Sequence, residues 1–160
     1  MPLLPTALLL TTLLPPTPIT RFTWPLPPPH PVVRAYQAPT SPFGPGHRGV
    51  DLSAPAGTAV LAAADGVVIH AGAVAARTLV SLEHRGNLRT TYEPVDPAVT
   101  TGRQVRRGEV IGHLQEGHCP SPCLHWGARR GHEYLDPLRL VSTGRVRLLP
   151  LGPAPPARGG

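Results

Sequence analysis

The chain has 160 residues and a net charge of +6, and 23 prolines and 17 glycines make up a quarter of it. This length fits one domain, and the lack of a glycine at every third position excludes collagen. Only 15% of the residues are charged and no heptads occur, which argues against a coiled coil. All 15 basic residues are arginines, and a pI near 10.6 suits an anionic partner such as nucleic acid, a membrane surface or an anionic polymer of the cell envelope.

The N-terminal region indicates export. Residues 3–14 are apolar and end at Pro15-Pro16, which is the length of a signal-peptide core and too short to span a bilayer. We therefore expect a signal peptide or apolar leader over residues 1–18, no stable membrane span, and a secreted or envelope-associated bacterial protein. No Lys or Arg precedes the stretch, so a disordered proline-rich start is the alternative.

Residues 19–42 predict a proline-rich linker with edge strands. Pro27-Pro28-Pro29 favours extended polyproline conformation, whereas Phe22, Trp24 and Leu26 alternate as in a strand. Residues 32–36 indicate a second short strand. At the other end, residues 142–160 predict a C-terminal tail that is disordered from Pro150.

Between these ends the chain predicts short strands separated by glycine-containing turns. Residues 49–52, 59–63, 66–72, 79–84 and 88–92 are apolar or alternate with a period of two, and Arg85-Gly86-Asn87 forms a turn. A further turn at residues 106–109 precedes residues 110–112, and no window shows a helical apolar stripe. We therefore predict an all-β domain, a small antiparallel β-sandwich or barrel.

Two short segments carry candidate metal ligands. On a strand, His47, Gly49 and Asp51 share one face, and Gly49 leaves room between the other two for an ion. Cys123 and His125 share a face in the same way. Two histidines and one carboxylate form a suitable zinc set, and three protein ligands leave a fourth position open, as in catalytic zinc sites. The His-x-x-x-Asp spacing alone is weak, because an exposed pair arises easily by chance.

The surrounding motifs carry a resemblance to a known family. They are residues 46–52, 55–60, 62–68, 79–92, 102–112, 124–126 and 134–138. In this order they resemble the lysostaphin-type (LytM-like) zinc metallopeptidases over residues 43–141. The resemblance implies a small antiparallel β-fold that cleaves peptide cross-bridges or stems of bacterial peptidoglycan. It also implies one zinc ion, with His47, Asp51 and His125 as its ligands.

The chain departs from that family at two assisting histidines. Family members have a His-x-His motif where this chain has Cys123 before His125, and a histidine two positions after a tyrosine where this chain has Pro94. Weak catalytic candidates are His118, whose other interpretation is an exposed loop residue, and Cys123. We expect Glu93 to face away from the site. We interpret the histidines at 70, 84, 113 and 132 as surface or turn residues.

Cys119 and Cys123 are the only cysteines. In an exported chain an even number favours a disulfide, which would stiffen the segment before His125. Alternatively, the Cys123 thiolate is a fourth zinc ligand in a closed site. A third hypothesis is a zinc knuckle of His118, Cys119, Cys123 and His125 for nucleic acid, but no second cluster or basic helix supports it.

Two functions therefore remain. The first is a zinc metalloendopeptidase that hydrolyses peptide bonds of peptidoglycan. The second is a catalytically impaired zinc-binding cell-wall module or hydrolase activator, which the replacement of histidine by Pro94 and Cys123 favours. Both functions imply cell-wall peptides as partners, and a basic surface would also suit anionic envelope polymers; we expect no nucleic acid.

Overall fold

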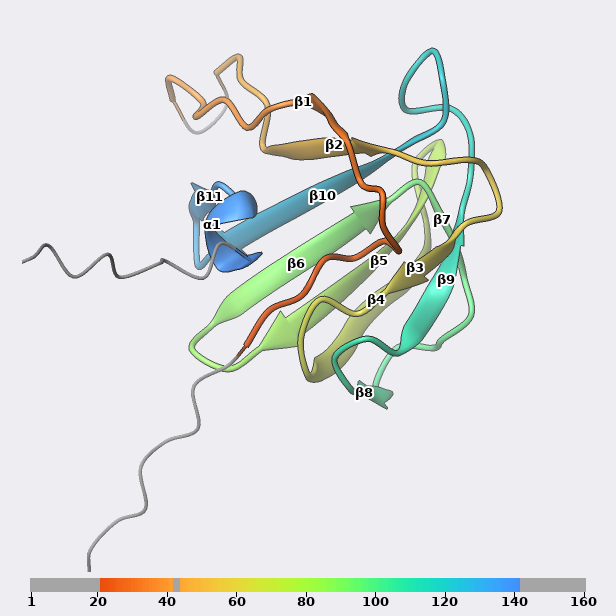
Figure 1. Ribbon diagram of the computed structural model, residues 1–160. Helices are drawn as coiled ribbons and strands as arrows, with labels where there is room; N and C mark the ends of the chain where they lie inside the picture. The colour runs from red at the N-terminus through yellow and green to blue at the C-terminus, as the bar shows by residue number, and fades with distance from the viewer. Residues whose placement is uncertain (1–20, 42–43, 142–160) are drawn as a thin grey trace, which may run out of the picture.

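The computed structural model describes residues 21–41 and 44–141 (Figure 1). The expected leader over residues 1–18 and the expected tail over residues 142–160 lie outside the described residues. Within the described part, no helix is long and apolar enough to cross a membrane.

Strands form almost all of the regular structure. They are β1 Val32–Arg34, β2 Gly49–Ser53, β3 Ala59–Leu61, β4 Gly66–Val74, β5 Arg77–His84, β6 Leu88–Glu93, β7 Val95–Pro97, β8 Gln104–Val105, β9 Val110–Leu114, β10 Cys123–Arg130 and β11 Glu133–Leu135. One short helix, α1 Leu138–Val141, follows them. This confirms the predicted all-β class.

The strands form two antiparallel sheets (Figure 1). The large sheet has the order β1-β2-β10-β6-β5-β4-β8, with β11 paired to β10, and the small sheet has the order β3-β9-β7. The hairpin between β5 and β6 turns at residues 85–87 as predicted, where Gly86 and Asn87 have φ angles of 74° and 55°. Glycine and asparagine adopt this left-handed conformation most easily.

The core lies between the two sheets. The large sheet contributes one face of its central strands, including the fully buried Trp126, Tyr92 and Leu82, and the small sheet contributes Val60 and Ile111. Because successive strand residues point to opposite faces, the residues between them face away from this core. The second face of the large sheet is therefore free to carry a site.

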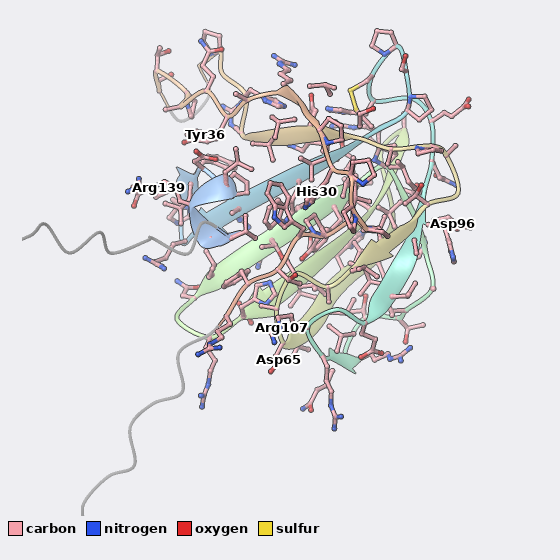
Figure 2. The ribbon with its side chains drawn as sticks, in the orientation of Figure 1. His30, Tyr36, Asp65, Asp96, Arg107 and Arg139 are labelled. Atoms are coloured by element: carbon pink, nitrogen blue, oxygen red, sulfur yellow. A yellow bond between two sulfur atoms is a disulfide. The ribbon has the colours of Figure 1, made fainter. Side chains whose placement is uncertain are left out.

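The N-terminal segment differs from the predicted linker with two edge strands. Residues 22–26 form no strand, but Leu26 is buried in the core and the Thr23 N–H donates to the Ala63 carbonyl at 2.7 Å. Figure 2 shows His30 over the sheet, where its ring lies 3.9 Å from that of Trp24. Three short elements, β7, β11 and α1, are not predicted from the sequence, because each has too few residues to show a period.

The prediction for His84 is wrong. This side chain lies on β5 and is only 5% exposed. Its Nδ1 donates to the carbonyl of Asp65 at 2.8 Å, and its Nε2 lies 2.7 Å from the Thr90 hydroxyl. Burial lowers the pKa of His84 and outweighs the opposing effect of its contact with Asp65.

Candidate metal centre

The two segments with candidate ligands become neighbours through the large sheet. Strand β2 pairs with β10, and the register places Asp51 directly opposite His125. Residues opposite each other on antiparallel strands share a face, so both side chains point to the face that does not form the core. His47 lies just before β2, where an isolated β-bridge pairs it with Gln37.

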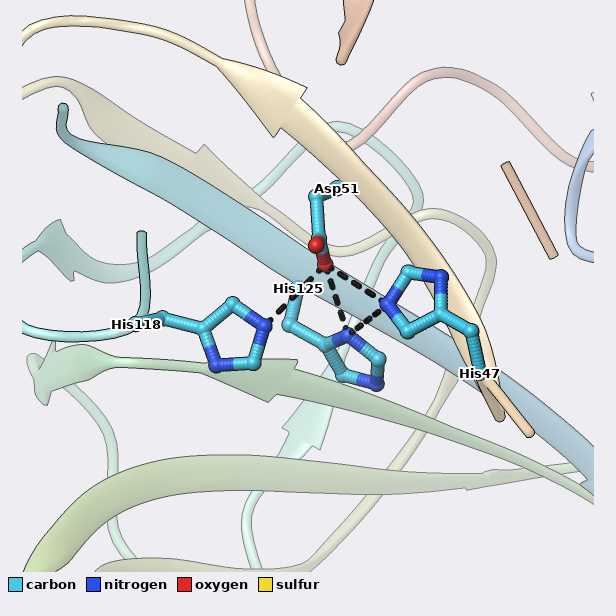
Figure 3. Close-up of side chains that lie close together, drawn as sticks. All are labelled: His47, Asp51, His118 and His125. Carbon is cyan, nitrogen blue, oxygen red and sulfur yellow. Dashed lines mark hydrogen bonds and ion pairs between the residues drawn. The ribbon is translucent and has the colours of Figure 1, made fainter. Parts of the chain in front are cut away.

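Three donor atoms meet at this point (Figure 3). Asp51 Oδ1 lies 3.0 Å from His47 Nε2 and 2.8 Å from His125 Nδ1, and the two histidine nitrogens are 3.1 Å apart. His47 and Asp51 are almost completely buried, whereas His125 is partly exposed. The structure thus brings together the three residues proposed as ligands, although the sequence separates Asp51 from His125 by 74 positions.

Gly49 makes this convergence sterically feasible. A Cβ at Gly49 would lie 2.4 Å from the Trp126 carbonyl oxygen and 2.7 Å from His125 Nε2. The space that the sequence suggested for an ion between His47 and Asp51 is therefore occupied by the imidazole of His125. The glycine permits the His125 ring to approach β2 closely and to direct its Nδ1 toward Asp51.

A backbone contact fixes the orientation of the His47 ring. His47 Nδ1 lies 2.8 Å from the carbonyl oxygen of Ala35, which can only accept, so Nδ1 carries a hydrogen. In the neutral ring Nε2 then presents its lone pair to Asp51 Oδ1 and His125 Nδ1. In metal-binding histidines, a hydrogen bond from the ring nitrogen that does not face the metal commonly sets the tautomer.

His118 also lies at the centre, contrary to its interpretation as an exposed loop residue. It belongs to the loop between β9 and β10, and its Nε2 is 3.2 Å from Asp51 Oδ1 (Figure 3). Its side chain is 19% exposed. Burial lowers the pKa of His118 and outweighs the nearby carboxylate of Asp51.

Glu93 faces the site, so the prediction that it points away is wrong. Glu93 lies opposite His125 in the pairing of β6 with β10 and is buried. Its Oε1 accepts a hydrogen bond from Arg77 at 2.5 Å and lies 3.7 Å from His118 Nδ1. Glu93 thus places a negative charge behind the His118 ring, on the side away from Asp51.

Cys119 and Cys123 form a disulfide in the structure, with their Cα atoms 5.9 Å apart. The bridge closes a loop that begins directly after His118 and ends two residues before His125. Cys123 is buried and has no free thiol to offer a metal. The disulfide therefore fixes the loop that brings His118 to Asp51.

Charges at the centre favour the ionised form of Asp51. Burial raises the pKa of this carboxyl, but the hydrogen bond from His125 and the electrostatic influence of the three neighbouring imidazoles outweigh burial, so the pKa lies below its ordinary value. An ionised carboxylate among imidazole nitrogens is a donor set that suits zinc, whereas magnesium and calcium prefer oxygen ligands. The side chains of His47, Asp51, His118 and His125 hold donor atoms within 4.8 Å of one another. These residues fit a zinc ion.

The centre borders a groove of about 670 Å³ that runs along the second face of the large sheet. His125, His118 and Glu93 line one end of the groove, and Arg48, Tyr134 and side chains of β4, β5, β6 and β10 line the remainder. An extended peptide could therefore lie along the strands with one bond beside the candidate ligands.

The model of peptidase family M23 matches residues 45–137, which is more than half of the chain. The chain belongs to peptidase family M23. In this M23 chain the match spans β2 to β11 and contains all four clustered side chains.

Curated proteins of two bacteria are similar to the chain over 97 to 138 residues. Uncharacterized protein Rv2891 of Mycobacterium tuberculosis is 47% identical over 138 residues, covering 82% of this chain and 55% of the relative. The DD-carboxypeptidase/endopeptidase Mpg of Neisseria meningitidis is 33% identical over 97 residues, covering 59% of this chain and 23% of the relative. This M23 chain thus spans about half the length of the mycobacterial relative.

The fold agrees with a solved structure of a peptidase. The catalytic domain of the antimicrobial peptidase lysostaphin from Staphylococcus simulans superposes with a TM-score of 0.61 at 24% identity. The superposition covers 70% of this chain and 92% of that domain. At this level of sequence identity, the similarity between the two structures establishes that they share a fold.

Proposed function

We propose that the protein is a secreted or envelope-associated, zinc-dependent endopeptidase that hydrolyses peptide bonds of bacterial peptidoglycan. The observation that carries the proposal is the convergence of His47, Asp51 and His125, with donor atoms 2.8–3.1 Å apart, beside a groove that His125 lines. Membership of family M23 supports the class of reaction. The name of the Neisseria relative, a carboxypeptidase and endopeptidase, agrees with it.

In this proposal His47, Asp51 and His125 hold one zinc ion. When bound, zinc supplies Lewis-acid polarisation of a peptide carbonyl and makes water a nucleophile near neutral pH. The carbonyl of Ala35, which lies 2.8 Å from His47 Nδ1, would keep Nε2 of the same ring directed at the ion. Gly49 leaves the room that His125 would need to reach it.

His118 takes the part of the assisting histidines that Pro94 and Cys123 replace. Its imidazole reaches the centre from the loop after β9, with Nε2 facing the donor set and Nδ1 facing Glu93. An imidazole in this place can hold a proton at Nε2 during attack by water and release it to the leaving amine. Such help contributes roughly 10²–10⁴-fold to a rate.

A second candidate function is a zinc-binding cell-wall module without turnover. The observation that favours it is the loss of both family histidines, one to Pro94 and one to a disulfide-bonded cysteine. The module would bind cell-wall peptides or stimulate another hydrolase. The two functions differ in whether the zinc-loaded protein cleaves peptide bonds.

One experiment separates them. The zinc-loaded protein is incubated with purified peptidoglycan, and new amino groups and soluble peptides are measured for the wild type, His118→Ala, His47→Ala and the exposed control His113→Ala. The endopeptidase predicts release by the wild type and His113→Ala, little release by His118→Ala with bound zinc retained, and loss of zinc in His47→Ala. Binding without release by the wild type would support the module, and retained release by His118→Ala would exclude its assisting role.

A further inference from the structure

The groove has a strongly basic end away from the metal centre. Arg89 on β6 and Arg129 on β10 both line it. The strand register places these two arginines directly opposite each other. Both side chains are partly buried, so the pair lies within the groove wall rather than on an open surface.

Two like charges in this position repel each other. Like charges directly opposite on antiparallel strands destabilise a sheet. Within the part of the chain that the structure describes, no carboxylate lies within ion-pairing distance of Arg89 or Arg129. Glu83 lies opposite Arg89 on its other side, but it is exposed and makes no ion pair with it. An anion between the two guanidinium groups would remove the repulsion.

The same register connects the arginine pair to the metal centre. His125, Gly127 and Arg129 alternate along β10, so they share the groove face, and Glu93 and Arg89 do the same on β6. Arg129 follows His125 by four residues. At about 3.3 Å per residue, the arginine pair lies about 13 Å from the candidate ligands. That span equals about four residues of an extended peptide.

The other charged side chains of the groove have partners. Arg77 donates to Glu93 next to the centre. Arg48 donates to the Gly44 carbonyl at 3.0 Å and lies over the Tyr134 ring. Among the described residues, Arg89 and Arg129 therefore differ from the remaining arginines of the groove in having no hydrogen-bond, ion-pair or cation–π partner for their side chains.

We infer that Arg89 and Arg129 form a carboxylate subsite. It takes an acidic group of an extended peptide substrate about four residues from the bond that lies at the metal centre. Guanidinium groups bind carboxylates through paired hydrogen bonds, which fix a position along the groove as well as adding affinity. The inference rests on the proposed function, which makes the metal centre the place where a peptide bond is cleaved. The subsite itself concerns binding, so it can be tested apart from cleavage. Substrates whose carboxylates are blocked lose this anchor.

The test uses peptidoglycan in two forms, with its carboxyl groups free or converted to neutral amides. Binding to each form is measured by co-sedimentation, and amine release by the zinc-loaded protein is measured in parallel. Four proteins are compared: the wild type, Arg89→Gln, Arg89→Gln/Arg129→Gln and the control Arg106→Gln/Arg107→Gln. The control removes the same charge at exposed residues between β8 and β9, where Figure 2 shows Arg107 beside Asp65.

We expect the double variant at 89 and 129 to bind the free-carboxylate form about tenfold more weakly, the size of a lost hydrogen bond to a charged group. The wild type should show the same loss when the carboxylates are blocked, and the double variant should not distinguish the two forms. The control should behave as the wild type. Zinc content should be unchanged, and Arg89→Gln should melt no lower than the wild type, because a repulsion has been removed.

Other outcomes overturn the inference without confusion with the proposed function. Equal binding of both forms by the wild type, or equal losses in the control and the double variant, excludes a carboxylate subsite even where amine release persists. If the double variant binds more weakly but blocking the carboxylates has no effect on the wild type, the arginine pair binds another anion, and this result also excludes a carboxylate subsite. Carboxylate-dependent binding without any amine release keeps the subsite and rejects the endopeptidase.

Discussion

Gly49 offers a sharp test of how the metal centre is built. Replacing it by alanine adds a Cβ 2.4 Å from the Trp126 carbonyl oxygen and 2.7 Å from His125 Nε2. The first neighbour is backbone of the paired strand β10 and cannot rotate away. Strands β2 and β10 must therefore separate, or β10 must shift along its axis, at the point where Asp51 meets His125.

The magnitude follows from two opposing effects. Inserting a methyl group into a packed interior costs about 1–3 kcal/mol. Replacing glycine by alanine also restricts the unfolded chain, which stabilises by about 0.4–1 kcal/mol. The expected net loss for Gly49→Ala is about 1–2 kcal/mol. For a domain of this size that lowers the melting temperature by roughly 4–8 °C.

Gly127 is a matched control. It lies directly opposite Gly49 in the same strand pair and is also buried, but a Cβ there would approach nothing closer than the Arg48 carbonyl oxygen at 3.4 Å. Gly127→Ala should therefore be neutral or slightly stabilising. Urea denaturation of the metal-free wild type and the two variants measures the difference, and zinc titration of the folded proteins should show weaker affinity for Gly49→Ala alone. Equal stability of the two variants would refute the steric argument.

Three further predictions concern stability. Tyr92→Phe should lose about 1–3 kcal/mol, because the buried Ala63 N–H now donates to the Tyr92 hydroxyl at 3.1 Å and would have no acceptor; an unchanged urea midpoint would contradict this. Burial lowers the pKa of His84 in the fold, so the unfolded chain takes up a proton more readily and stability falls as the pH drops through the ordinary value of 6.5. His84→Gln should flatten this fall in urea midpoints measured between pH 8 and 5 (roughly the window of histidine titration), and an unchanged slope would exclude His84 as its source. Replacing Cys119 and Cys123 by serine should cost about 2 kcal/mol for so small a loop and lower amine release while zinc stays bound; an unchanged turnover would show that the disulfide does not position His118.

The strands were predictable where the two-residue period is strong. Residues 79–84 and 88–92 alternate and flank a turn whose Gly86 and Asn87 tolerate positive φ angles, and the hairpin β5–β6 follows them closely. The segment at residues 22–26 also alternates, but only two backbone hydrogen bonds join it to the end of β3 and the residues after it. They run from the Thr23 N–H to the Ala63 carbonyl and from the Leu61 N–H to the Pro25 carbonyl, so apolar burial rather than a ladder holds the segment.

The candidate ligands were predictable because their positions are local. His47 and Asp51 lie four residues apart next to a strand, and His125 lies on a strand with core residues on both sides. What the sequence does not specify is the pairing of β2 with β10, which sets Asp51 against His125. That register is a property of the whole sheet.

Glu93 was missed although a signal was present. Tyr92 is an aromatic residue of the predicted strand and is fully buried, so its neighbour on the strand had to face the opposite side, which is the groove. The prediction took Pro94 as the residue on the side of the site and therefore placed Glu93 on the opposite side, instead of using Tyr92 as the reference. Choosing the core-forming residue as the reference would have placed the carboxylate correctly.

His118 could not be placed in the same way, because loops carry no period. The relevant signal was the disulfide pair that begins directly after it. Cys123 occupies the position at which the family resemblance expects a histidine, and the same residue is one end of the bridge that fixes the loop carrying His118. The replacement thus removes one imidazole from the centre and, through Cys119, holds another 3.2 Å from Asp51 Oδ1. The motif at residues 123–125 shows only the loss, whereas the fold places another imidazole at the centre. Amine release by the wild type therefore decides between a peptidase and a binding module, and the assay of His118→Ala decides whether His118 assists the reaction.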